Sequence, residues 1–288
     1  MLSDLALLPN SALSVLGLIL GLLVGSFLNV VIFRYPNLLK HQWTVQSRAW
    51  LELAPTEDPP PPGIISPASH CGHCGSSVKP WQNIPILSFL LLRGKCGSCK
   101  KAIGWRYPMV ELLTGMLCAI VVYQFGWSLQ SAFGLLLTWV LVALTFIDFD
   151  HQLLPDDIVL TTLWLGIGLS LVPVYTDPKS SIIGAIAGYL AFWMVFQLFL
   201  RLTGKEGMGY GDFKLLSLLG AWLGWQYLPQ IILLSTLIGS VFGILLMIRQ
   251  RAGGDTAIPF GPYIALAGWI ALCWGDQINS AYAAYSGY

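Results

Sequence analysis

Two aspartates stand where apolar stretches begin or end, places at which an ionised carboxylate is costly. Asp148 lies in "LTFIDFD" (residues 144–150), and Asp212 follows the alternating glycines of "GMGYGD" (207–212). Ionisable groups in such surroundings indicate function by default. A carboxylate at a helix C-terminus opposes the helix dipole, so helix structure gives little reason for Asp148. Asp212 could cap a helix, but the flanking Gly209 and Gly211 would also let an extended peptide approach closely.

Two carboxylates that meet at one site can perform acid–base chemistry as a pair. Like charges at short range cannot both ionise cheaply, so one of the two keeps its proton. The ionised partner can take a proton from water while the protonated one polarises a peptide carbonyl. This is aspartic-protease chemistry, which needs neither a metal nor a covalent intermediate. We therefore expect Asp148 and Asp212 to form a catalytic dyad.

The other acidic residues near apolar stretches have plainer interpretations. Asp156 and Asp157 follow "LLP" and are expected to be helix N-caps. Asp150 lies further into the loop beyond Asp148 and is expected to be solvated. Glu111 lies near the start of an apolar run, where a carboxylate favours the helix N-terminus.

Four cysteines form two Cys-x2-Cys pairs, "CGHC" (71–74) and "CGSC" (96–99), separated by 21 residues. Each pair can place two thiolates on one tight turn, and two turns complete a tetrahedral zinc site. The alternatives are two disulfides or four unused thiols. We expect a closed, structural zinc site with His70 and His73 beside it rather than bound to the metal. Its ligands would be Cys71, Cys74, Cys96 and Cys99.

The composition indicates a membrane protein that must position these groups. Of 288 residues, 56% are hydrophobic and 10% are charged, whereas soluble domains carry about 25% charged residues. The net charge of +1 suggests no nucleic-acid surface. The apolar runs predict an all-α polytopic membrane protein with about eight transmembrane helices. These runs are 11–33, 109–125, 129–147, 158–174, 182–202, 213–225, 231–248 and 258–274.

Two of these runs are unusual. The sixth would rise only about 20 Å as a helix, so we expect it to be buried within the bundle. The eighth is interrupted by Pro259 and Pro262. Glycines recur at small-xxx-small spacing in several runs, which favours close helix packing. They include Gly17, Gly21, Gly25, Gly184, Gly188, Gly220, Gly224, Gly239 and Gly243.

The basic residues predict the orientation. Segment 34–107 carries nine of the fifteen lysines and arginines, and positive segments stay in the cytoplasm. The N-terminus is then outside, and Arg201, Lys205, Lys214, Arg249 and Arg251 also lie at cytoplasmic ends, with Lys179 outside. The leader 1–4 has no Lys or Arg, so the first run is expected to stay as a helix rather than be cleaved.

This orientation places Asp148 and Asp212 at the same face of the membrane. Helix 129–147 would reach the cytoplasm at Asp148, and helix 213–225 would leave it at Asp212. We expect three parts: a first transmembrane helix (1–33), a cytoplasmic four-cysteine zinc module (34–107) and a transmembrane bundle (108–288). Within the module, the proline-rich stretch 55–67 predicts an extended, unpacked linker. Segment 84–92 is too short to span and should lie against the membrane or pack inside the module.

Together these motifs resemble the type IV prepilin peptidases, the aspartic leader peptidases and N-methyltransferases of bacterial type IV pilus and type II secretion systems. The resemblance runs from the first apolar run to the sixth, in the order of the family. It is carried by "GSFLNVVIFRYP" (25–36), the two cysteine pairs, "YPMVELLTG" (107–115), "FIDFDHQLLPD" (146–156) and "GMGYGDFKLLSLLGAWLG" (207–224).

The resemblance implies that Asp148 and Asp212 are the catalytic aspartates and that the four paired cysteines are the family's cysteines. It implies a prepilin or pseudopilin substrate with a short basic leader, cut after a glycine on the cytoplasmic face of the inner membrane. The new N-terminal residue would then be methylated with S-adenosylmethionine. No residues for that cofactor are indicated, and the insert and the end of the first helix are the expected region. Substrate contacts are expected at Glu111, Gly209 and Gly211.

Two other interpretations remain open at this point. A membrane aspartic protease without methyl transfer would fit the aspartates but would not need four cysteines. A proton- or cation-coupled transporter with a regulatory zinc module could use the same acids. A transporter would place them nearer the membrane centre, whereas both are expected at cytoplasmic helix ends.

Overall fold

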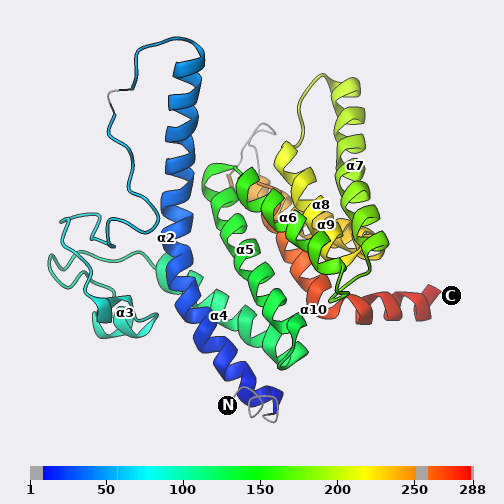
Figure 1. Ribbon diagram of the computed structural model, residues 1–288, viewed down its shortest axis with the longest axis horizontal. Coiled ribbons are helices and arrows are strands. Elements are labelled where there is room, and N and C mark those ends of the chain that lie inside the picture. Colours follow the sequence, from blue (N-terminus) through cyan, green and yellow to red (C-terminus); the bar gives the residue numbers. More distant parts are fainter. Residues whose placement is uncertain (1–8, 57, 251–258, 287–288) are drawn as a thin grey trace. The chain divides into compact units, whose positions relative to one another are not determined.

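The computed structural model describes residues 9–56, 58–250 and 259–286, and these residues are folded into helices joined by irregular segments (Figure 1). The all-α prediction is confirmed, and each of the eight apolar runs overlaps one long helix. The long helices are α2 (Asn10–Trp50), α4 (Arg106–Phe125), α5 (Leu129–His151), α6 (Asp156–Ser170), α7 (Pro178–Thr203), α8 (Tyr210–Leu223), α9 (Leu228–Gln250) and α10 (Gly261–Ser286). The short ones are η1 (Pro80–Asn83), α3 (Leu87–Leu91) and η2 (Trp225–Tyr227).

Within the described residues, five helices are long and apolar enough to cross a membrane. They are α2, α4, α5, α7 and the stretch Trp225–Leu245, which covers η2 and most of α9. Helices α6 and α8, with 15 and 14 residues, are shorter than the roughly 20 residues that a span needs. Arg251 and Ile258 of the expected topology, and the leader 1–4, lie outside the described residues.

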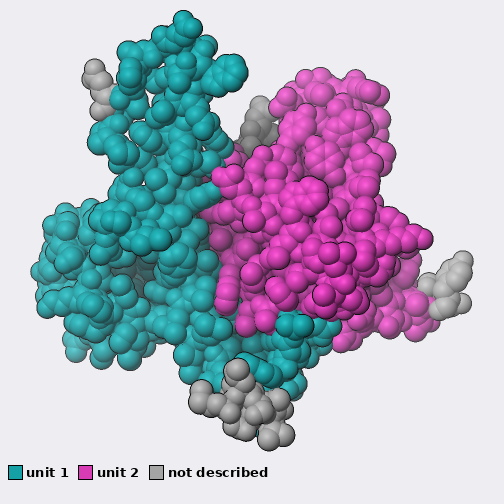
Figure 2. Space-filling view, in the orientation of Figure 1, with its two compact units in different colours: residues 1–131 teal, residues 132–288 magenta. Residues whose placement is uncertain are grey.

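The chain divides into two compact units, residues 1–131 and 132–288 (Figure 2). In the first unit, α2 packs along α4 through the glycines that the spacing singled out. A Cβ at Gly21 would come 2.7 Å from the Thr114 carbonyl, and one at Gly25 would come 2.9 Å from the Cα of Glu111. Close packing, as predicted, explains these glycines.

Helix α2 is longer than the sequence suggested, because it continues from the expected end at residue 33 to Trp50. Seven of the 17 residues from 34 to 50 are Leu, Lys, Gln or Arg, which are good helix formers, and the lower apolar content of this part gave no signal for a membrane helix. The proline-rich stretch has no helix or strand among its described residues, as expected. Its end is nevertheless packed, since the buried Arg34 donates from Nη1 to the carbonyls of Gly63 and Pro67.

In the second unit, the short helix α8 is central. Every α8 residue from Asp212 to Leu223 except Lys214 is buried, so the expectation of a buried sixth helix is confirmed. Gly184 of α7 and Gly220 of α8 meet backbone to backbone, and neither position has room for a Cβ. The Trp222 side chain donates to the carbonyl of Thr162, which joins α8 to α6.

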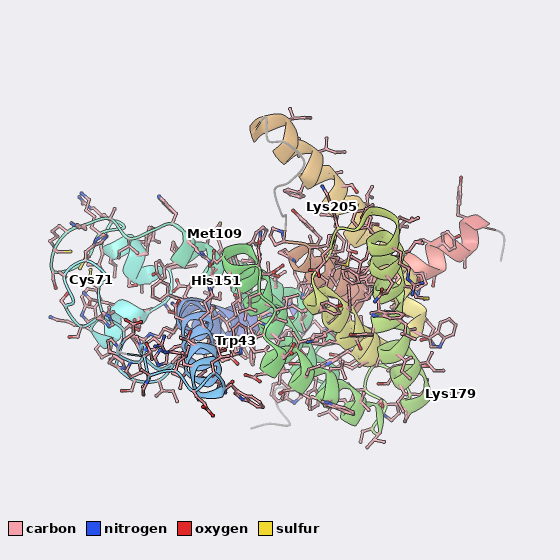
Figure 3. All side chains as sticks on the ribbon, turned by 90° about the horizontal axis from the view of Figure 1, so that it is seen from above. Trp43, Cys71, Met109, His151, Lys179 and Lys205 are labelled. Carbon is pink, nitrogen blue, oxygen red and sulfur yellow. The ribbon has the colours of Figure 1, made fainter. Side chains whose placement is uncertain are left out.

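Helix α7 is a long apolar element of this unit. Figure 3 labels Lys179 near the start of this helix and Lys205 just beyond its end. Helix α10 begins at Gly261, with Pro262 in its first turn, where a missing N–H is tolerated. The prolines that seemed to interrupt the eighth run therefore mark the start of its helix.

Candidate active site and cysteine cluster

The second unit brings the two predicted catalytic residues together. Asp148 lies in the last turn of α5 and Asp212 in the first turn of α8. The two residues are only 5% and 7% exposed, and their carboxyl groups interact electrostatically. Asp150, two residues after Asp148, is exposed to solvent as expected.

The Asp148 carboxyl group is held by the start of α10. The backbone N–H of Gly261 donates to Asp148 Oδ2 over 3.1 Å. The N-terminus of a helix carries a partial positive charge, which offsets the unfavourable end of α5. Sequence reasoning missed Gly261, although two prolines on either side of a Phe-Gly pair are a signal for a helix start.

Asp212 is not the N-cap of α8. That position is taken by Gly209, which has no side chain to form a cap hydrogen bond, and Asp212 is the third helical residue. The Asp212 carboxyl group does hydrogen bond with the Gly209 backbone, which is half of a capping box. The Asp212 carboxylate therefore has a structural contact at the start of α8 as well as its proposed catalytic role.

Leu154 packs between the glycines that neighbour the two carboxyl groups. A Cβ at Gly211 would lie 2.8 Å from Leu154 Cβ. A Cβ at Gly261 would lie 2.6 Å from Asp148 Oδ2 and 3.2 Å from Leu154 Cδ1. The close approach of Leu154 accounts for Gly211, whereas a Cβ at Gly209 would be 4.0 Å from Asp212 Oδ2, an ordinary contact.

The expectation that Asp156 and Asp157 are N-caps is wrong. The N-cap of α6 is Pro155, and both aspartates lie in the first turn, where the helix dipole still favours them. Asp156 instead forms an ion pair with Lys214, whose Nζ lies 2.7 and 2.8 Å from the two carboxylate oxygens. This pair ties the start of α6 to the start of α8.

The first unit contains the cysteine cluster. The four predicted ligand sulfurs lie within 4.8 Å of one another, and neither His70 nor His73 belongs to the group. Cys71 Sγ is 3.9 Å from Cys99 Sγ, close to the roughly 3.8 Å edge of a tetrahedron with 2.3 Å Zn–S bonds. All four are free cysteines, so the disulfide alternative is not realised.

The two cysteine turns have the same backbone construction. In the first, the Cys71 N–H donates to Ser76 and the Gly75 N–H to Cys71. In the second, the Cys96 N–H donates to Lys101 and the Lys100 N–H to Cys96. The backbone N–H groups of Cys99 and Ser98 lower the pKa of Cys96 to about 6, whereas partial burial and the other three thiols raise the pKa of Cys99 to about 11.

Glu111 is buried in the first unit and is bound within the chain. Its Oε2 accepts the backbone N–H of Ile86 over 2.8 Å. Ile86 has φ +57° and ψ −49°, close to the classic γ-turn, which is rare and strained, so the carboxylate stabilises a strained turn. Figure 3 shows Cys71 at the outer edge of this unit, apart from Met109 near the start of α4.

Comparisons with known proteins find a family match in each of the two units. The model of the Bacterial Peptidase A24 N-terminal domain matches residues 19–125, and that of the Type IV leader peptidase family matches residues 135–244. A prepilin leader peptidase/N-methyltransferase of Pseudomonas aeruginosa is 51% identical over 94% of this chain and 93% of its own length. A protein of the same name from Neisseria gonorrhoeae is 45% identical over 96% of both chains.

No solved structure matches the chain. The family resemblance drawn from the sequence motifs is confirmed, because relatives at about half identity cover more than nine-tenths of the chain. The chain belongs to the type IV leader peptidase family, peptidase family A24.

Proposed function

We propose that this protein removes the leader peptide from type IV prepilins and pseudopilins and then N-methylates the new N-terminal residue. Relatives that cover almost the whole chain are named for both activities. The observation that carries the peptidase activity is the meeting of two buried carboxyl groups, Asp148 and Asp212, from the ends of two different helices.

In the proposed hydrolysis, the ionised carboxylate of the dyad takes a proton from a water molecule. The water oxygen attacks the carbonyl carbon of the scissile peptide bond, and the protonated carboxyl group donates a hydrogen bond to the carbonyl oxygen. The tetrahedral intermediate then collapses, and a proton passes to the leaving nitrogen as the peptide bond breaks. The Gly261 N–H keeps Asp148 oriented through this sequence. Gly209 is the proposed point of close approach for the substrate backbone, with Gly211 beside it.

Methyl transfer requires a neutral amine aligned with the methyl sulfonium of S-adenosylmethionine, which supplies the methyl group when bound. Alignment of the two reactants accounts for much of such a rate enhancement. We place this activity with the first unit, which the N-terminal family model matches separately. Glu111 is the proposed contact for the substrate amine, because it is a buried carboxylate near the start of α4.

The four cysteines are proposed to bind one structural zinc ion. Four thiol ligands leave no open coordination position, so the ion would hold the two turns together rather than act in catalysis. The spacing of the sulfurs and the matching turns support this assignment.

The protein is proposed to span the bacterial inner membrane with eight helices. Helices α6, α8 and α10 would complete the set beyond the five that meet the length and hydropathy requirements on their own. The N-terminus would be periplasmic and the dyad would face the cytoplasm. Its macromolecular partners would be prepilin and pseudopilin substrates in the lipid bilayer, with no nucleic acid.

The test is to incubate the purified protein in liposomes with a prepilin and to measure the product mass with and without S-adenosylmethionine. We expect loss of the leader in both cases and one added methyl group only with the donor. Leader removal without methylation would contradict the second activity, and an unchanged substrate would contradict the first. Metal analysis under reducing conditions should find one zinc per chain, and its absence would contradict the zinc assignment.

A further inference from the structure

A cluster of exposed apolar side chains surrounds the short helix α3, and we name Ile84, Leu87, Leu90 and Leu91 the α3 surface. These four residues are 45%, 50%, 63% and 66% exposed. Leu87, Leu90 and Leu91 are spaced i, i+3, i+4 and therefore lie on one face of the helix. Phe89 lies off this face and packs against Trp105, with ring centroids 5.1 Å apart. The exposed leucines are thus a surface of the module and not an unfilled part of its core.

The charged residues in the chain around this surface are all basic. Between residues 79 and 106 there are six lysines and arginines and no aspartate or glutamate. All but Arg106 are exposed. They are Lys79, Arg93, Lys95, Lys100, Lys101 and Arg106. Exposed apolar side chains flanked in the sequence by cations are complementary to a membrane surface that contains anionic phosphate headgroups.

The position of α3 within its unit fits that partner. Its first residue follows Ile86, whose backbone N–H donates to Glu111 in the second turn of α4. Helix α4 is long and apolar enough to cross a membrane, and its start is the end expected at the cytoplasmic interface. In Figure 1, α3 is drawn at the level of the half of α2 that packs on α4, well away from the α2 end at Trp50. The hydrogen bond therefore fixes α3 near the depth at which α4 enters the bilayer.

We propose that the α3 surface lies in the cytoplasmic leaflet of the membrane that the chain itself spans. Its four apolar side chains enter the acyl region, and the surrounding cations bind anionic phosphate headgroups. The cysteine module is thereby attached to the membrane at a second place besides α2 and α4. This inference rests on the proposed membrane topology, and the experiment separates the two.

The experiment uses the full-length protein in nanodiscs of phosphatidylglycerol, with a photoactivated carbene reagent dissolved in the lipid. Mass spectrometry then reads the label at each segment. Residues 109–120 of α4 are the internal standard for the bilayer. Residues 50–53 are the matched control, because Trp50, Leu51 and Leu53 are also 89%, 68% and 53% exposed. These control residues are separated from residue 33, the expected end of the first membrane span, by about 25 Å of helix at 1.5 Å per residue.

We expect residues 84–91 to take up label at a level similar to α4, and at least about fivefold more than residues 50–53, as lipid burial requires. Equal, low labelling of both segments beside a labelled α4 would overturn the proposal and leave the membrane topology intact. An unlabelled α4 would overturn the topology as well.

Two comparisons test the chemistry of the contact. The double substitution Leu90→Ser and Leu91→Ser should reduce the label at 84–91, whereas Leu51→Ser should not, with bound zinc measured as evidence that the module is folded. Nanodiscs of phosphatidylcholine, which has no net charge, should lower the label at 84–91 but not that in α4. Labelling that is independent of lipid charge would overturn the headgroup contact.

Discussion

At the scale of single residues, the carboxyl groups of the candidate site are positioned by backbone groups. Gly261 donates its N–H to Asp148, and the Gly209 backbone hydrogen bonds with Asp212. Backbone donors at helix ends are fixed by the fold and need little reorganisation as charge develops. Such donors suit a site that must hold two carboxyl groups in a fixed relative orientation.

Gly261→Ala should impair catalysis through Asp148. The new Cβ would lie 2.6 Å from Asp148 Oδ2, so the carboxyl group must move. A displacement of about 1 Å can cost on the order of 100-fold in rate, and we expect kcat for leader removal to fall by about that factor. Gly168→Ala, at a position with no atoms nearby, is the matched control and should leave kcat unchanged. Equal rates for both variants would contradict the positioning role.

Gly75→Ala should weaken the first cysteine turn. Gly75 has φ +69° and no neighbour that a Cβ would touch, so the cost is purely conformational, about 1–2 kcal/mol. Gly72→Ala, which also meets no atoms and has no left-handed φ, should cost little. Competition with a chelator measures this difference as easier metal loss from Gly75→Ala only. Equal metal retention by the two variants would show that the turn does not limit the stability of the site.

At the scale of elements, helix ends carry most of the polar structure. Asp177 caps α7, and its Oδ1 accepts the N–H groups of Lys179 and Ser180 over 3.0 and 3.1 Å. Hydrogen bonds from the side chain and backbone of Ser180, and from the Lys179 backbone, lower the pKa of Asp177 from its ordinary 3.8. The folded-state pKa is thus below the unfolded one, so this stabilisation is present above about pH 4 and is lost as the pH falls through the folded-state pKa.

Asp177→Asn should remove that pH dependence while keeping the cap. Asn caps helices about as well as Asp, but it does not titrate. Between about pH 6 and pH 3 the thermal unfolding midpoint of the wild type should fall relative to that of the variant. Parallel midpoints over this range would contradict a native-state contribution from the Asp177 carboxylate.

The sequence was sufficient to locate the helices, because long apolar runs in a chain with so few charges are typical of membrane helices. It placed α8 correctly as a buried helix, since the run was too short to span alone. It did not predict that α2 continues to Trp50, because polar helix formers carry no apolar signal. The prediction that Asp156 and Asp157 cap α6 was also wrong. Pro155 takes the N-cap position, and Asp156 pairs with Lys214, a partner 58 residues away.

At the scale of the whole molecule, each of the two matched family segments, 19–125 and 135–244, lies within one of the two compact units. The carboxylate pair and its supporting backbone lie wholly in the second unit, and the paired cysteines lie wholly in the first. Charge distribution and helix order were enough to predict that Asp148 and Asp212 would meet. The role of Gly261 was beyond the sequence, because it depends on a contact across 113 residues.

The most direct test of the central claim is the rate of leader removal by Asp148→Asn and Asp212→Asn, each compared with Asp150→Asn. Asn keeps the size of the side chain but cannot take or give the proton that hydrolysis requires. We predict that both dyad variants insert normally and lose cleavage, while Asp150→Asn, at an exposed position two residues from Asp148, cleaves at the wild-type rate. Near wild-type cleavage by either dyad variant would contradict a catalytic pair of Asp148 and Asp212.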